Sequence, residues 1–147
     1  MKNQRGVTLL ELIVVMVIIA LGAILVVPQI GAWAPRYRLN GAVREMVSTL
    51  RVAQVQAVAR NTAYRVQFSP DTGAYVLQRD AGGGNWVDEK PVSLPQGIQM
   101  QAITWAGNSV PFYTNSSSSS GSLKLINRKG TMKTITVTSA TGRIHID

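Results

Sequence analysis

The sequence predicts an α+β chain, in which one long N-terminal helix, transmembrane in its first half, precedes and packs on a small antiparallel β domain. Three observations predict this order. Val7–Val27 is almost wholly apolar, residues 39–58 repeat apolar side chains at helical spacing, and the residues after Thr62 alternate. We expect a short basic segment over 1–6, a transmembrane helix over 7–30, its continuation over 31–61 and the β domain over 62–147.

The apolar segment has the length of a membrane span. As a helix, Val7–Val27 extends roughly 30 Å, which matches the hydrocarbon thickness of a bilayer. It is too long for the apolar core of a secretory signal, and no A-x-A cleavage pattern follows it. Lys2 and Arg5 precede it, which places the N-terminus in the cytoplasm and the rest of the chain outside. A plain signal anchor for a soluble domain would show the same hydropathy.

One acid, Glu11, interrupts the apolar segment near its start. A carboxylate at bilayer depth costs roughly 2.5–3.5 kcal/mol on insertion scales. Glu11 is therefore a candidate functional residue whose charge needs a partner.

Gly22 and Pro28 predict a soft stretch later in the same segment. Pro28 cannot donate a hydrogen bond to the Ile24 carbonyl, and glycine is a weak helix former. An ordinary kink near the membrane exit is the alternative. We also expect the helix to break at Gly31–Pro35 before it continues.

The continuation carries an apolar stripe that predicts the face packed on the β domain. The stripe consists of Leu39, Val43, Met46, Leu50, Ala53 and Ala57, widened by Val47 and Val58. The other faces carry Arg36, Arg38, Arg44, Arg51 and Arg60. These arginines indicate either a solvated helix surface or a surface that faces another subunit or lipid.

Seven short segments are predicted as strands, with a further short piece at Trp86-Val87. They are residues 64–68, 74–79, 98–105, 110–113, 123–127, 133–138 and 143–146. Asp71-Thr72-Gly73, residues 127–130 and residues 140–142 are predicted turns. Gly82-Gly83-Gly84 is a loop rather than a phosphate cradle, because no Lys-Ser/Thr and no helix follow it. The serine run over 116–120 is predicted to be a mobile loop.

The residue inventory argues against an enzyme. His145 is the only histidine, and it shares one strand face with Asp147, which does not make the buried, oriented base of a serine triad. No cluster has metal-ligand spacing, and Asp88-Glu89 is only a faint candidate for calcium. We therefore predict no catalytic residues, no cofactor and no metal. The absence of cysteine excludes a disulfide-closed C-terminal loop.

The residues Arg5-Gly6-Val7-Thr8-Leu9-Leu10-Glu11-Leu12 resemble the class III signal of type IV pilins and pseudopilins. The resemblance implies that prepilin peptidase removes the leader 1–6 by cutting between Gly6 and Val7, and then methylates Val7. Phe is the usual residue after the cut, and here it is Val7. In a bundle of such helices, Glu11 of one subunit can meet the Val7 ammonium of another. Because buried ion pairs often only offset their desolvation, we expect this pair to set register rather than add stability.

The C-terminal half is similar to the GspH/FimT group of minor pseudopilins and minor pilins. The residues that carry the similarity are Val110-Pro111-Phe112, the later Gly-containing loop, Leu123–Asn127 and Thr141-Gly142-Arg143-Ile144. The group pairs a long helix with a small two-sheet β domain, and its filaments unwind a stretch such as Gly22–Pro28. The expected function is a subunit that assembles into, or primes, a type IV pilus or a type II secretion pseudopilus. Expected partners are other subunits, the peptidase and inner-membrane lipid, with the domain in the periplasm.

A net charge of +8, or +6 without Lys2 and Arg5, allows a second function. The FimT branch is linked to DNA uptake through a basic C-terminal patch closed by Gly-Arg-x-Arg, which here reads Gly142-Arg143-Ile144-His145. Candidate residues for sequence-independent contact with duplex DNA are Lys124, Arg128, Lys129, Lys133 and Arg143. A basic surface without a ligand, or one that faces an acidic neighbour, remains the alternative.

Overall fold

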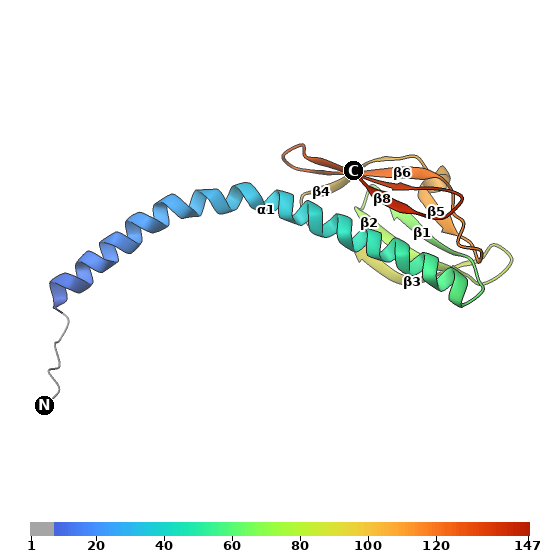
Figure 1. The fold of residues 1–147 in the computed structure, drawn as a ribbon, viewed down its shortest axis with the longest axis horizontal. Coiled ribbons are helices and arrows are strands. Elements are labelled where there is room, and N and C mark those ends of the chain that lie inside the picture. The colour runs from blue at the N-terminus through green and yellow to red at the C-terminus, as the bar shows by residue number, and fades with distance from the viewer. Residues whose placement is uncertain (1–7) are drawn as a thin grey trace, which may run out of the picture. The chain divides into compact units, whose positions relative to one another are not determined.

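The computed structural model describes residues 8–147, and of residues 24–32 it describes the backbone alone. One long helix, α1 (Leu9–Ala59), comes first and antiparallel strands follow it (Figure 1). The predicted α+β class is therefore confirmed. The chain divides into two compact units, Met1–Ala34 and Pro35–Asp147. The second unit takes in the C-terminal half of α1, because that half supplies one wall of the core.

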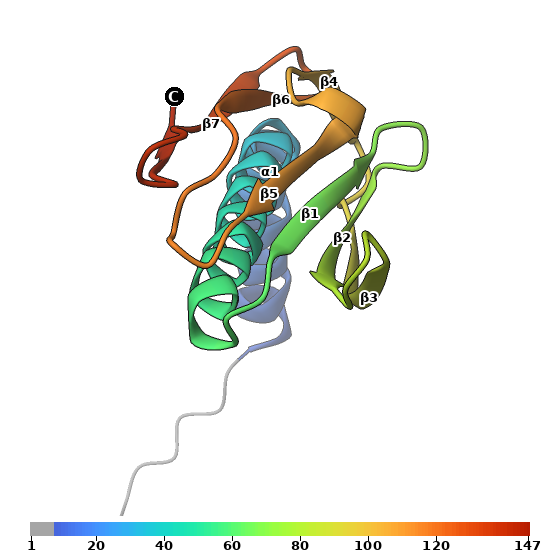
Figure 2. The same cartoon turned by 90° about the vertical axis from the view of Figure 1, so that its right-hand side faces the viewer.

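The strands form two antiparallel sheets of four strands each. The first sheet has the order β3-β2-β1-β5, built from β3 (Trp86–Ser93), β2 (Ala74–Asp80), β1 (Tyr64–Ser69) and β5 (Ser109–Phe112). The second has the order β4-β6-β7-β8, built from β4 (Ile98–Ile103), β6 (Gly121–Asn127), β7 (Met132–Val137) and β8 (Ile144–Ile146). A short 3-10 helix, η1 (Ala106–Asn108), precedes β5. In end view α1 lies beside both sheets (Figure 2).

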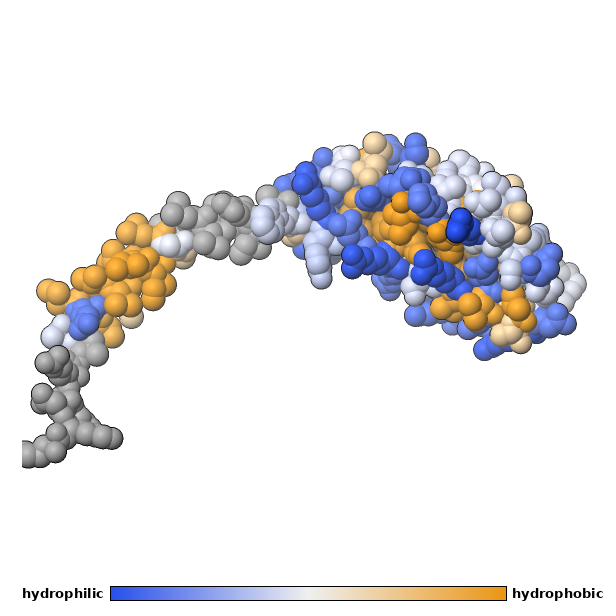
Figure 3. Space-filling view, viewed as in Figure 1, coloured by the Kyte–Doolittle hydropathy of each residue, from blue (hydrophilic) through white to orange (hydrophobic). Residues whose placement is uncertain are grey.

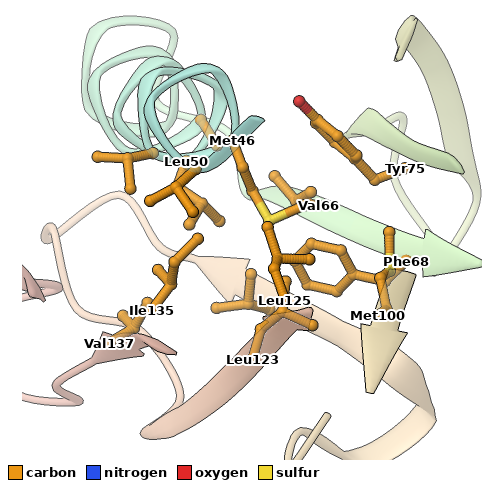
Figure 4. Packing of buried hydrophobic residues seen from close by; sticks show 14 of the residues in the cluster. Met46, Leu50, Val66, Phe68, Tyr75, Met100, Leu123, Leu125, Ile135 and Val137 are labelled. Atoms are coloured by element: carbon orange, nitrogen blue, oxygen red, sulfur yellow. The ribbon is translucent and has the colours of Figure 1, made fainter. Parts of the chain in front are cut away.

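The core lies where the apolar stripe of α1 meets the inner faces of the two sheets. Met46 and Leu50 point from the helix toward Val66 of the first sheet and Leu125 and Ile135 of the second (Figure 4). All six members of the predicted stripe and Val47 are buried. Burying the leucine, valine and methionine side chains of this set contributes roughly 1.5–3 kcal/mol each. The prediction for Val58 was wrong, since its side chain is exposed, and Ala42 is a buried residue that the stripe omitted.

The predicted helix break at Gly31–Pro35 is absent, because α1 continues through these residues without interruption. Proline removes one backbone donor and crowds one carbonyl, and its φ still suits a helix. The helical turns on either side keep the chain in register. The continuation ends at Ala59, two residues before the expected boundary.

The largest difference among the strands is β3, which extends over eight residues where only Trp86-Val87 was predicted. Its charged residues and Pro91 hid it, because they break the apolar alternation that identifies a strand. β3 is an edge strand, so a proline is tolerated there and its polar side chains face solvent.

The predicted strand over 98–105 is two residues longer than the observed one at its C-terminal end, which was predicted to include Trp105. β4 stops at Ile103, and Trp105 turns into the core, where its ring stacks on Phe68 with the ring centroids 5.8 Å apart. The Trp105 indole Nε1 donates a hydrogen bond to the Ser119 carbonyl at 3.0 Å. A Cβ added at Gly121 would come within 2.5 Å of this ring, so the first residue of β6 must be small.

The serine run, predicted to be a mobile loop, contacts the domain through Ser118. Ser118 is buried, forms an isolated bridge with Phe112, and donates its hydroxyl to the Pro111 carbonyl at 2.8 Å. Its backbone N–H donates to the Ser139 carbonyl at 2.9 Å. The run therefore lies against the domain and links β5 to the β7–β8 connection.

Candidate assembly and ligand-binding surfaces

The N-terminal unit is a helix with a defined start. The Thr8 hydroxyl accepts a hydrogen bond from the Glu11 backbone N–H at 3.2 Å, as an N-cap residue does for the third residue of a helix. The Thr8-Leu9-Leu10-Glu11 spacing is that of a capping box, a signal that the sequence analysis missed. Glu11 itself lies in the first turn, where a carboxylate suits the helix dipole.

The large apolar side chains of this helix are exposed around its whole circumference. From Leu9 to Leu21 their exposed fractions range from 48% at Val14 to 77% at Leu9 (Figure 3, orange). A helix that is apolar on all sides is normally surrounded by other helices or by lipid. A Cβ at Gly22 would meet no atom within 4 Å, so no contact within the chain requires glycine there.

Several predicted features of this segment cannot be placed. Gly6 and Val7 lie outside the described residues, so the cleavage site and its ammonium are not part of the described geometry. Pro28 is described by its backbone alone, which is helical. Within the part of the chain that the structure describes, no helix combines the length and apolarity that a membrane span needs.

A second apolar surface lies between α1 and the edge strand β8. It is an open groove of about 660 Å³ with Val52, Val55 and Ile146 on its walls. Hydrophobic residues gather over this part of the helix, with hydrophilic residues around them (Figure 3). Arg44 and Arg51 line the same groove. Ile146 faces the core side of the sheet opposite Ile135, and its side chain is 39% exposed.

The five basic residues proposed for DNA do not form one patch. Lys124 pairs with Thr134, and Lys133 pairs with the buried Leu125, so the two lysines point to opposite faces of the second sheet. Arg143 is exposed just before β8, on the face of His145. Arg128 and Lys129 lie in the turn between β6 and β7. DNA binding by this set stays a prediction.

Gly142 has a packing role that the sequence motif did not indicate. Its φ is +58°, and an added Cβ would come within 2.6 Å of the Gln54 amide nitrogen and 2.7 Å of the Ser116 carbonyl oxygen. Gln54 of α1 donates to the Thr141 carbonyl at 3.0 Å. The glycine of the Gly-Arg-x-Arg-like segment therefore allows the β7–β8 connection to close onto the helix.

A charge cluster that the sequence analysis missed lies at the end of the domain where α1 finishes. Glu89 Oε1 accepts hydrogen bonds from Arg60 Nη1 at 3.2 Å and from the Tyr64 hydroxyl at 3.0 Å, and it forms an ion pair with Arg79 Nε at 3.3 Å. Burial raises the pKa of the Tyr64 phenol, and the Glu89 carboxylate raises it further. No sequence spacing indicates this cluster, because its members come from the turn after α1 and from β1, β2 and β3.

The predicted calcium pair Asp88-Glu89 is divided between different partners. Asp88 accepts from the Gln78 amide at 2.7 Å, whereas Glu89 is committed to the cluster around Tyr64. Nearby, the Arg65 guanidinium lies 4.2 Å from the centroid of the Trp86 ring, and burial lowers the pKa of Arg65. Among the described residues, no three His, Cys, Asp or Glu side chains converge as metal ligands.

His145 and Asp147 lie on one face, as predicted, and His145 Nε2 is 3.1 Å from Asp147 Oδ1. Both side chains are well exposed. Within the described chain they form a surface pair without the buried setting of a catalytic base.

Comparison with known families matches two parts of the chain. Residues 1–27 match the prokaryotic N-terminal methylation motif, and residues 42–142 match the family described as type II transport protein GspH. No curated protein matches the chain significantly.

Solved structures with the same fold come from two machines. The minor pseudopilin EpsH of the Vibrio cholerae type 2 secretion system aligns with a TM-score of 0.63 at 11% identity, covering 75% of this chain and 96% of that one. The Pseudomonas aeruginosa type IV minor pilin FimU aligns with a TM-score of 0.63 at 17% identity, covering 76% and 90%. At these identities the likeness concerns the fold.

Proposed function

This chain belongs to the GspH family of type II transport proteins and is a minor pseudopilin or minor pilin, and from this premise we propose that it assembles through its N-terminal helix after peptidase cleavage. The proposed cut lies between Gly6 and Val7, with methylation of the new Val7 amine. The family is a structural one, and its members work by assembling with other pilin or pseudopilin subunits.

The observation that carries this proposal is the contrast between the exposed apolar helix and a domain whose core is complete without it. The buried core begins at Leu39 and draws on both sheets. None of the described large apolar residues from Leu9 to Leu21 belongs to that core. Such a surface is stable in water only when lipid or other helices cover it. We place it in the inner membrane before assembly, with the domain in the periplasm, and in the helix bundle of the fibre afterwards.

Glu11 is the proposed register contact within that bundle. Among the described residues it forms no ion pair, and Thr8 holds its backbone in the first turn of α1. The free amine made by cleavage at Val7 of a neighbouring subunit supplies the missing positive charge. Pairing the two charges avoids burying either of them alone, which is the costly arrangement.

Substitution of Glu11 tests the assembly function. Glu11→Ala should leave cleavage and methylation intact by mass spectrometry, yet remove the subunit from purified filaments, while Glu11→Asp should retain part of the incorporation. Glu45→Ala is the matched control, since Glu45 is an exposed acid on the same helix. Normal incorporation of Glu11→Ala, or equal loss with Glu45→Ala, would contradict the register role.

A further inference from the structure

Two arginines from distant parts of the sequence line the same small hollow at the end of the domain where α1 enters. Arg38 comes from α1, and Arg128 comes from the β6–β7 turn. The hollow measures about 40 Å³ and is completed by Pro35, Gln96, Gly97 and Ile98. Only folding brings these two residues, 90 positions apart in the sequence, to one hollow.

Arg128 is held in position by its surroundings. A Cβ added at Gly97 would lie 3.1 Å from Arg128 Nε and 3.2 Å from its Cδ, so the arginine side chain runs along the bare Gly97 backbone. The turn that carries it is also constrained, because the Asn127 side-chain oxygen accepts from the N–H groups of Lys129 and Thr131, both at 2.9 Å. Arg128 therefore presents its charge from a fixed turn.

No acid neutralises these two arginines within the part of the chain that the structure describes. The ion pairs there involve Arg60, Arg79 and His145, and none involves Arg38 or Arg128. Asp71, in the turn between β1 and β2, is an exposed acid whose neighbours Thr72 and Gly73 line a pocket with Arg128, and the structure gives it no ion pair with either arginine. Two arginines that line one hollow without an ion-paired carboxylate favour an anion from outside the chain.

The position of the hollow along the chain indicates which anion. The unit begins at Pro35, so this is the end at which the chain arrives from the apolar segment. Arg36 follows Val27 by only nine residues in the sequence, and long arginine side chains reach back toward an interface. Tyr37, between the two helix arginines, is 82% exposed, and tyrosine is enriched at headgroup depth.

We propose that Arg38 and Arg128 bind the phosphate of an anionic phospholipid and hold this end of the domain against the membrane before assembly. The proposal rests on the proposed membrane anchoring of residues 7–30. A guanidinium group can donate two hydrogen bonds to the oxygens of one phosphate. Each basic side chain near an anionic membrane surface also strengthens the attraction of the protein to that surface. Assembly into a fibre would exchange these lipid contacts for contacts with other subunits.

The test uses the full chain in lipid nanodiscs of phosphatidylcholine, alone or mixed with phosphatidylglycerol. Because the chain has no cysteine, a dye on the Thr131→Cys variant reports on the β6–β7 turn through energy transfer to labelled headgroups. We expect transfer to rise in the anionic discs, and the combined Arg38→Gln and Arg128→Gln substitutions to abolish that rise. Combined Arg44→Gln and Lys90→Gln removes the same charge at exposed positions elsewhere and should preserve the rise. A dye on Asn85→Cys, in the β2–β3 loop, should not respond.

Three outcomes would overturn the proposal. Equal transfer in neutral and anionic discs would show that lipid charge is not recognised, and equal loss in the control pair would reduce the effect to net charge. Binding of duplex DNA that depends on Arg38 and Arg128, without any response to phosphatidylglycerol, would assign the hollow to nucleic acid. Failure of the chain to enter discs at all would instead contradict the membrane anchoring, and this separates the two proposals.

Discussion

The two ends of the Pro35–Asp147 unit handle charge in opposite ways. Near the C-terminal end of α1, Glu89 forms ion pairs with Arg60 and Arg79 and accepts a hydrogen bond from the Tyr64 hydroxyl. The charges there are therefore paired within the chain. Where α1 begins its contact with the sheets, Arg38 and Arg128 line one hollow without an ion pair to any described acid. We call the end at Glu89 the closed end, because its ion pairs stabilise the fold. We call the end at Arg38 and Arg128 the open end, because its charges are suited to an outside partner.

The largest losses in the free energy of unfolding are expected from alanine substitution of two glycines, one packed against backbone and the other against a flexible side chain. Gly142→Ala places a Cβ against a backbone carbonyl and the Gln54 amide at a φ of +58°, and we expect a loss of roughly 2–4 kcal/mol. Gly97→Ala also has positive φ, but its Cβ meets only the flexible Arg128 side chain, so roughly 1–2 kcal/mol is expected. Urea unfolding of both variants checks the order, and a larger loss for Gly97→Ala would contradict it.

Substitution of Glu89 should reduce the free energy of unfolding by less than Gly142→Ala does, because it removes only the interactions of the closed end. Glu89→Ala leaves the Tyr64 hydroxyl without its acceptor and leaves Arg60 and Arg79 without their carboxylate. We expect a loss of about 1–3 kcal/mol in the free energy of unfolding. Asp88→Ala, which removes the adjacent exposed acid, is the control and should cost less. Equal effects would mean that the cluster adds no stability.

Alkaline pH should weaken the domain through Tyr64 of β1 and Tyr75 of β2, two buried tyrosines of the first sheet. Burial raises the pKa of Tyr75 to about 12, and burial with Glu89 raises that of Tyr64, from an ordinary value of 10.0. The folded chain therefore keeps protons that the unfolded chain releases. Stability should be full below pH 10 and fall as pH rises toward 12.

Urea midpoints of the wild type and of Tyr75→Phe across this pH window check that dependence. The variant should lose less stability between neutral and alkaline pH than the wild type does, while Tyr113→Phe, at a half-exposed position, should behave like the wild type. A pH slope unchanged by Tyr75→Phe would contradict the assignment.

The smallest effect on stability is expected at the open end. Arg38→Gln with Arg128→Gln removes two cations that have no described ion pair, so the free energy of unfolding should change by about 0.5 kcal/mol or less. Differential scanning calorimetry at low salt is the measurement. A loss of unfolding free energy comparable to that of Glu89→Ala would show that both ends stabilise the fold, and it would contradict the proposed difference between them.

Regular patterns account for what sequence reasoning found in the fold. The stripe from Leu39 to Ala57 and the alternation in β1 and β2 each bury one face, and that burial is written in the spacing of apolar residues. β3 was missed beyond Val87 because an edge strand can be polar and can contain Pro91. The helix break was wrong, since one proline does not outweigh the helical turns on both sides.

The candidate surfaces divide in the same way. Glu11 was found because one acid in an apolar run is visible in the sequence, and its Thr8 cap is equally local. The cluster at Glu89 and the hollow at Arg128 were not found, because their members come from different elements and meet only when the chain folds. Strand register also places Lys124 and Lys133 on opposite faces of the second sheet, whereas the sequence prediction had put them in one basic patch.

The sequence by itself determined the order of elements, the apolar N-terminal helix, the methylation motif and the helix face that builds the core. These are local properties, in which neighbours along the chain supply both the signal and the structure. Only the tertiary structure decided which charges are satisfied and which are open, because Coulomb attraction and hydrogen bonding depend on distances between residues that chain order leaves free. It also decided that Gly142 serves the closure of a loop on Gln54, since the clash that demands glycine exists only in the folded chain.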